Sequence, residues 1–218
     1  MYDRVLYVTG ATGPRHEAWL SYTLPLMQKH LGRENILVTP GKRRGDVNGF
    51  IWTTMAVDDE IRDKYDRLVW IDADVEILSS DFAEFGYYDV GDKEAWACLD
   101  PVPERGLADR KFAKERLGVE IPHDRPYLNT GVLGLNLSAI DKDDWNRRLD
   151  FFKDAAGIPA IIGDQSVLHC MTDAAVAPPK FNVYWSWRDI VPDACAIHYN
   201  YAGPEAKLPL DEKCGWRG

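Results

Sequence analysis

Short apolar runs that are typical of buried β-strands alternate along this chain with stretches of helical periodicity. The strand-like runs are residues 5–8, 35–38, 67–71, 95–99 and 130–135. Helical patterns cover residues 16–31, 53–65 and 141–154. This alternation is typical of an α/β fold with a mostly parallel central sheet flanked by helices. Because the 218 residues contain no internal repeat and no low-complexity linker, we expect one compact domain over residues 1–218.

Glycine and proline predict where these elements end. The glycines of residues 9–13 predict a turn after the first strand, and Gly32 ends the first helix. Pro25 predicts a kink or a break inside that helix. Residues 100–128 contain four prolines, so we expect an irregular segment with one short helix.

The composition narrows the classes of function. A net charge of -9 disfavours nucleic acid as a partner, because phosphate contacts need a basic surface. No apolar run approaches the roughly 20 residues of a membrane span, and no export signal begins the chain. Four widely spaced cysteines form no CxxC pair, which favours reduced thiols in a cytoplasmic protein. The chain could equally be one module of a larger protein.

Two aspartates, Asp72 and Asp74, stand at the end of the most strand-like run. In a strand that continues, they would present their carboxylates on the same face. Adjacent carboxylates repel, and Mg²⁺ or Mn²⁺ is the natural ion to lie between them. A solvated strand end is the alternative, since aspartate is also a good turn residue. The apolar flanks, residues 69–71 and 75–78, favour a buried setting and therefore a metal site.

The carboxyl ends of parallel strands form the edge at which ligands bind in such sheets. This rule places Thr9, Asp72, Asp74 and the loop after Leu99 at one edge. Thr9 and Gly10, which end the first strand, are therefore candidates to contact a nucleotide.

Four segments, in order along the chain, resemble motifs of the GT-A-fold glycosyltransferases. They are residues 65–78 (YDRLVWIDADVEIL), 127–137 (YLNTGVLGLNL), 163–168 (GDQSVL) and 197–203 (IHYNYAG). The pattern is most similar to the glycogenin-like and galactosyltransferase-like family 8, and it spans about residues 65 to 209.

The resemblance implies a role for each matching residue. The implied metal ligands are Asp72, Asp74 and His198. The implied catalytic residues at the donor sugar are Asn129, Asp164 and Gln165. Gly203 and Lys207 would approach the diphosphate. Arg43 or Arg44 would replace a basic residue that the family carries before the acidic motif, or would belong to a solvated loop.

The implied activity is metal-dependent transfer of a hexose from a nucleoside-diphosphate sugar, with a UDP-sugar favoured. The acceptor would be a hydroxyl of a carbohydrate or another molecule, and the anomeric configuration would be retained. Residues 1–100 would form the nucleotide-binding half, and residues 101–218 the half for the sugar and acceptor.

Three alternatives remain open on the sequence. A sugar-phosphate nucleotidyltransferase would have a glycine- and arginine-rich loop after the first strand, which residues 9–15 faintly match. A dinucleotide-binding dehydrogenase would need a third glycine after Gly10 and Gly13. A non-catalytic carbohydrate-binding module would use the eight tryptophans as stacking surfaces and would need no metal.

Overall fold

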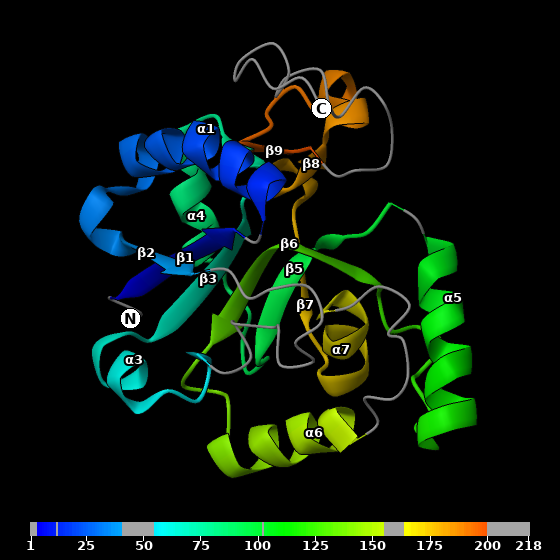
Figure 1. The fold of residues 1–218 in the computed structure, drawn as a ribbon. Coiled ribbons are helices and arrows are strands. Elements are labelled where there is room, and N and C mark those ends of the chain that lie inside the picture. Colours follow the sequence, from blue (N-terminus) through cyan, green and yellow to red (C-terminus); the bar gives the residue numbers. More distant parts are fainter. Residues whose placement is uncertain (1–3, 12, 41–54, 102, 155–163, 200–218) are drawn as a thin grey trace.

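A central sheet runs through the computed structural model, which describes residues 4–11, 13–40, 55–101, 103–154 and 164–199 (Figure 1). Among these residues the sheet has six strands. In spatial order they are β2 (Ile36–Pro40), β1 (Val5–Ala11), β3 (Arg67–Asp72), β6 (Leu128–Asn136), β5 (Ala95–Leu99) and β7 (Ala175–Ala177). β6 is antiparallel to its neighbours β3 and β5, and the other pairs are parallel. The predicted mostly parallel sheet is confirmed.

Helices pack on both faces of this sheet (Figure 1). In the described part of the chain the helices are α1 (Pro14–Leu31), α3 (Asp59–Lys64), α4 (Ala83–Gly86), α5 (Pro103–Phe112), α6 (Lys142–Asp154) and α7 (Asp164–Met171), of which α5 packs beside α7 (Figure 1). On one face Val5 of β1 shares a buried cluster with Met27 of α1. On the other face Leu6 shares a cluster with Trp145 of α6. β1 is apolar at consecutive positions because both of its sides are buried.

A second sheet forms beside the first and begins at the acidic motif. Its strands are β4 (Val75–Ile77), β9 (Ala196–His198) and β8 (Val183–Tyr184), in that spatial order. β9 pairs antiparallel with β4 and parallel with β8. Short helical connectors complete the described chain: η1 (Arg33–Asn35), η2 (Ser80–Phe82), η4 (Pro179–Phe181), η5 (Trp185–Ile190) and the π-helical η3 (Ala113–Leu117).

The predicted turn at residues 9–13 is wrong in its first part, because β1 continues to Ala11. Gly10 pairs in register with Thr39 of β2 on one side and Asp72 of β3 on the other. A Cβ at Gly10 would lie 2.5 Å from the Thr39 hydroxyl oxygen and 2.9 Å from the Thr39 carbonyl oxygen. Glycine is therefore needed here for the close approach of β2, and it does not mark a turn.

The first helix is longer than predicted and is not broken. α1 begins at Pro14, where a missing N–H is not needed, and continues through Pro25. Pro25 is exposed, so water can bind the carbonyl that loses its helical partner. The helix ends as predicted at Gly32, whose φ is 83° and whose N–H donates to the Gln28 carbonyl at 3.2 Å.

Two other helical predictions change in extent. Only the second half of residues 53–65 forms a described helix, α3, which Asp58 caps by accepting from the Ile61 N–H at 3.0 Å. Residues 53–54 lie outside the described residues. The segment 100–128 is less irregular than expected, since α5 and η3 occupy much of it. Pro103 lies at the start of α5, where proline favours a helix.

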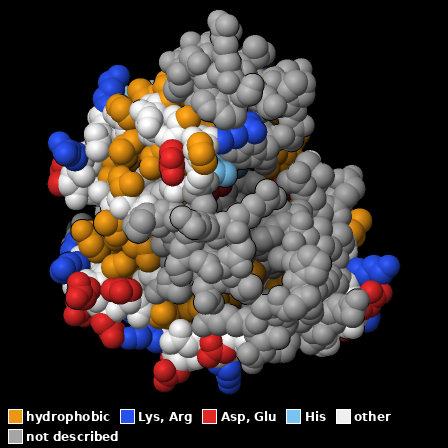
Figure 2. All heavy atoms as spheres, in the orientation of Figure 1, with side chains coloured by type: hydrophobic (Ala, Val, Ile, Leu, Met, Phe, Trp, Pro, Cys, Tyr) orange, Lys and Arg blue, Asp and Glu red, His pale blue; other side chains and the backbone are white. Residues whose placement is uncertain are grey.

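On the face shown in Figure 2, acidic and basic side chains lie along the left and lower edges, and hydrophobic side chains are exposed among them on the left. None of the helices in the described part of the chain has the length and apolar character of a membrane span.

Candidate active site

A two-residue turn carries the acidic motif. β3 ends at Asp72, Ala73 and Asp74 form the turn, and β4 begins at Val75. The prediction that both carboxylates lie on one face of a continuing strand is therefore wrong, although the two residues still converge. The Asp74 side chain is 5% exposed and that of Asp72 is 36% exposed. Trp70 holds Asp72 in place by donating from its indole nitrogen to Oδ1 at 2.7 Å.

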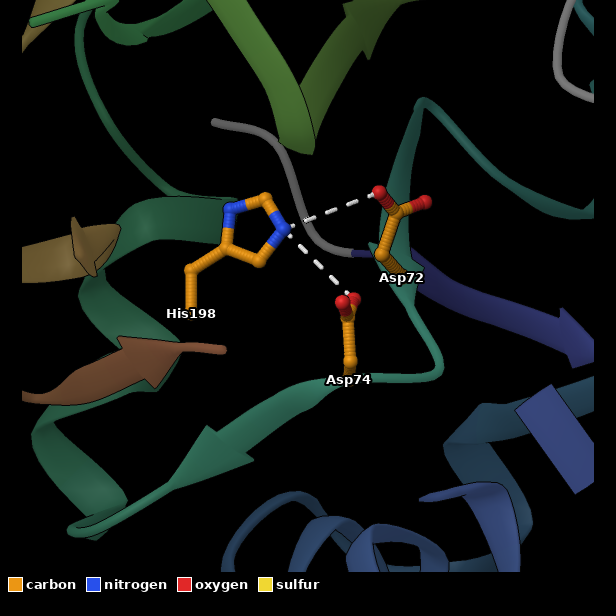
Figure 3. Close-up of side chains that lie close together, drawn as sticks. All are labelled: Asp72, Asp74 and His198. Atoms are coloured by element: carbon orange, nitrogen blue, oxygen red, sulfur yellow. Dashed lines mark ion pairs between the residues drawn. The ribbon is translucent and has the colours of Figure 1, made fainter. Parts of the chain in front are cut away.

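His198 meets this turn because β9 pairs with β4. His198 lies opposite Val75 in the register, and the next N–H, from Tyr199, donates to the Asp74 carbonyl at 3.0 Å. The imidazole Nε2 lies 3.5 Å from Asp74 Oδ1 and 4.0 Å from Asp72 Oδ2 (Figure 3). One ligand atom from each of the three residues lies within 4.8 Å of the others.

Electrostatics couple these three residues. Burial would raise the pKa of Asp74, but the His198 charge and its hydrogen bond, with a smaller contribution from His16, lower that pKa below its ordinary value. Burial would lower the pKa of His198, but Asp74, Asp72 and Asp100 outweigh it and raise that pKa. Without a metal, a proton on the imidazole is therefore favoured, and a cation must displace it to bind.

The three side chains fit a divalent ion. Ligand atoms held about 2.1 Å from one ion lie roughly 3 Å apart when adjacent and roughly 4 Å apart when opposite. The two Nε2–oxygen distances, 3.5 and 4.0 Å, lie within this range. Two carboxylates and one imidazole are ligands that divalent cations accept, and Asp72 is exposed enough to leave room for further ligands.

Gly131 of β6 makes room for the imidazole. A Cβ at this position would lie 2.2 Å from His198 Cε1 and 2.5 Å from its Nδ1. The Gly131 N–H donates to Asn129 Oδ1 at 2.9 Å. Gly131 therefore connects the metal ligands to a second group of polar side chains.

That second group, which we name the amide cluster, consists of Asp100, Asn129, Gln165, Asn182 and Tyr184. All five residues are buried. Asp100 Oδ2 accepts from Gln165 Nε2 at 2.5 Å and from the Tyr184 hydroxyl at 3.2 Å. Asn129 Nδ2 donates to the Tyr184 hydroxyl oxygen at 2.7 Å, and Asn182 Nδ2 donates to Asn129 Oδ1 at 2.8 Å.

The amide cluster and the candidate metal ligands form one continuous site. The rings of Tyr184 and His198 meet edge to face with centroids 5.5 Å apart. Tyr184 and His198 are also register partners of the β8–β9 pair. Asp100 raises the pKa of His198 through its charge. Amide and carboxylate groups thus lie next to the candidate metal ligands.

The predicted nucleotide residues lie at the same edge of the sheet. Gly10 is the register partner of Asp72, and Thr9 precedes it in β1. Thr9 is buried, and its carbonyl accepts from the Thr39 hydroxyl at 3.2 Å. The half-buried residues after Thr9, Gly10 and Ala11, are therefore better placed to contact a ligand.

Some predicted residues cannot be placed. The backbone of Asp164 begins α7, but its side chain is outside the described part. Gly203, Lys207, Arg43 and Arg44 lie outside the described residues.

Four residues of the site were not predicted from the sequence: Asp100, Gly131, Asn182 and Tyr184. Asp100 had a usable signal, since it is the first residue after β5 at the ligand-binding edge. Asn182 and Tyr184 had none, because β8 is only two residues long. Gly131 belongs to a predicted strand, but only the position of His198 explains it.

Comparison with known proteins identifies the family. The model of glycosyl transferase family 8 matches residues 56–204, which is more than half of the chain. A search of curated protein sequences returns no significant match.

Solved glycosyltransferases share the fold at low sequence identity. The galactosyltransferase LgtC, in complex with donor and acceptor sugar analogues, is 16% identical with a TM-score of 0.60, over 91% of this chain and 87% of LgtC. The bifunctional glycosyltransferase WbbM is 15% identical with a TM-score of 0.65, over 92% of this chain and 46% of WbbM. Mouse xyloside xylosyltransferase 1 is 15% identical with a TM-score of 0.57, over 93% of this chain and 99% of the mouse protein. The protein is a glycosyltransferase with a GT-A fold, and the chain belongs to glycosyl transferase family 8.

Proposed function

We propose that this protein transfers a hexose from a nucleoside-diphosphate sugar, with UDP-glucose or another UDP-sugar favoured, to a hydroxyl of a carbohydrate or other acceptor. Mn²⁺ or Mg²⁺ is the proposed cofactor, held by Asp72, Asp74 and His198. The observation that supports this most is the meeting of these three ligands beside the amide cluster. We propose residues 1–100 as the nucleotide-binding half and residues 101–218 as the half for the sugar and acceptor.

A bound ion would supply charge neutralisation to the diphosphate as its bond to the sugar breaks. Two carboxylates and one neutral imidazole balance the two positive charges of a divalent ion, so the remaining negative charge of a bound diphosphate would need a basic partner as well. Gly10, next to Asp72 in the sheet, is proposed to let the nucleotide approach the backbone. Gly203 and Lys207 are proposed to contact the same diphosphate.

The amide cluster is proposed to bind the donor sugar. Gln165 Nε2 donates to Asp100, so the amide is fixed in one orientation. A fixed amide oxygen can stabilise positive charge on the sugar ring, but an amide is a feeble nucleophile. By the resemblance to family 8 we propose retention of configuration, with Asp164, Gln165 and Asn129 as the catalytic residues at the donor sugar.

The proposal is tested by nucleotide binding with and without metal. Ligand at about 100 times its dissociation constant stabilises a fold by about 2.7 kcal/mol. For a chain of this size that corresponds to a rise in melting temperature of roughly 5–10 °C. We expect UDP to give this rise with Mn²⁺ and no rise with a chelator, and the matched variant Asp74→Asn to lose it.

Product analysis separates the alternative activities. A glycosyltransferase releases UDP from a UDP-sugar, whereas a nucleotidyltransferase releases pyrophosphate from UTP and a sugar phosphate. A carbohydrate-binding module binds sugar equally well with chelator. Either of the last two results would contradict the proposal.

A further inference from the structure

Helix α1 contacts the chain next to each of the three candidate metal ligands, although it contributes no ligand itself. Its contacts come from three residues on neighbouring turns: Trp19, Tyr22 and Thr23. These side chains meet residues 73, 76 and 199. Residue 73 lies between the two aspartates, residue 76 lies two positions after Asp74, and residue 199 follows His198.

Thr23 holds the turn between the two aspartates. Its side chain is fully buried, and its hydroxyl oxygen lies 2.7 Å from the Ala73 carbonyl oxygen and 3.1 Å from the Trp19 carbonyl oxygen. A hydroxyl has one hydrogen to donate, and the nearer acceptor is in the turn. The bond therefore fixes the peptide unit that joins Ala73 to Asp74, and with it the direction of the Asp74 side chain.

Glu76 joins α1 to both strands that carry ligands. The Tyr22 hydroxyl donates to one oxygen of this buried carboxylate, and the Tyr199 hydroxyl donates to the other at 2.5 Å. Glu76 belongs to β4, and Tyr199 directly follows β9. One carboxylate thus spans the helix, the strand after Asp74 and the strand end at His198.

Trp19 adds a third contact to the same face. Its ring stacks on the ring of Tyr199 with centroids 4.7 Å apart, and both residues are buried. The helix starts only a few residues after Gly10, at the edge of the sheet proposed to receive the nucleotide. A displacement of α1 would therefore move the metal turn relative to that edge.

We propose that Thr23, Tyr22 and Glu76 are positioning residues that hold Asp74 and His198 in the arrangement needed to bind the metal. This inference rests on the proposed function. Mutation of residues that support metal ligands typically lowers metal affinity by about 10- to 100-fold. Because Thr23 bonds to a backbone carbonyl and not to a ligand side chain, we expect a loss of affinity of about tenfold. The predicted effect is on metal affinity, separate from any effect on stability.

Two substitutions at one position separate these effects. Thr23→Val keeps the shape but removes the hydroxyl, and Thr23→Ser keeps the hydroxyl but removes a buried methyl group. We expect Thr23→Val to raise the Mn²⁺ dissociation constant about tenfold in calorimetry. The Mn²⁺ concentration for half-maximal activity should rise equally, while kcat at saturating Mn²⁺ stays near the wild-type value. Thr23→Ser should have a lower melting temperature and the wild-type affinity for Mn²⁺.

Thr172→Val is the matched control. Thr172 is also buried, and its hydroxyl donates to Glu94 Oε2 at 2.8 Å, beside the opposite end of β5 from Asp100. This variant should have a lower melting temperature than the wild-type protein and the same affinity for Mn²⁺. Glu76→Gln, which weakens the bonds to both tyrosines, should lower Mn²⁺ affinity in the same direction as Thr23→Val.

Two results would overturn the inference. One is wild-type Mn²⁺ affinity in both Thr23→Val and Glu76→Gln. The other is a loss of affinity in Thr23→Ser and Thr172→Val equal to that in Thr23→Val. Absence of Mn²⁺ binding to the wild-type protein would instead refute the proposed function, and this inference with it.

Discussion

Replacing Gly131 with alanine tests the position of His198. The new Cβ would lie 2.2 Å from Cε1 of the imidazole, whereas ordinary contacts begin at 3.4 Å. The ring must therefore retreat by about 1 Å or more. Metal–ligand distances tolerate about 0.2 Å, so a displacement of this size removes His198 from the ligand set. We expect Mn²⁺ affinity to fall at least about tenfold and stability to fall by about 1–3 kcal/mol.

The assay is Mn²⁺ titration calorimetry combined with urea denaturation in the presence of a chelator. Gly134→Ala is the matched control, because the same substitution in the same strand would place a Cβ 1.9 Å from the Trp96 ring. Gly134 lies three residues along β6 from Gly131, a distance of roughly 10 Å. Gly134→Ala should lose stability and bind Mn²⁺ with the affinity of the wild-type protein.

A double-mutant cycle with His198→Ala tests whether the clash with the imidazole causes the loss of stability in Gly131→Ala. With the imidazole removed, Gly131→Ala should cost much less stability, leaving mainly the contact at 2.9 Å with Asn129 Oδ1. Wild-type Mn²⁺ affinity in Gly131→Ala, or an equal cost of this substitution in both backgrounds, would refute the reasoning.

Three further predictions concern the charges of the site. Asp74→Asn keeps the side-chain size but removes a ligand charge; UDP release with Mn²⁺ should fall about 100-fold or more, and unchanged turnover would argue against a metal role. In the chelated protein, the pair of Asp74 and His198 should stabilise the fold between the lowered pKa of Asp74 and the raised pKa of His198. This stabilisation should disappear as pH falls through the pKa of Asp74 and as pH rises through the pKa of His198. Urea denaturation from about pH 3 to about pH 9 measures it, and His198→Ala should lack the extra stability in this pH range. Asp100→Asn leaves Gln165 and Tyr184 competing for a weaker acceptor, so stability should fall by about 1–3 kcal/mol and the donor KM should rise; a neutral result on both would remove Asp100 from the sugar site.

Much of the fold could be predicted because its signals are local. The apolar run at residues 67–71 predicted β3, and the run at residues 95–99 predicted β5. Gly32 correctly marked the end of α1. Gly10 led to a wrong prediction of a turn. Glycine is needed there because Thr39, about 30 residues further along the chain, packs too close for a side chain.

The candidate site was predicted in part. Asp72 and Asp74 stood out because apolar residues flank them on both sides, and His198 was identified by resemblance to the family. The structure brings the three together. Their geometry differs from the prediction, since the turn at Ala73 replaces a continuing strand.

The sequence by itself determined five strands of the main sheet (β1, β2, β3, β5 and β6), the acidic motif and the family to which the chain belongs. Tertiary structure decided how Asp100, Gly131 and Tyr184 join the site and how Thr23 holds its turn. The physical reason is the sequence distance over which each kind of signal acts. Periodicity and turn residues act over a few positions, whereas the site forms where β4, β9 and α1 meet, and no local pattern records which distant strands pair.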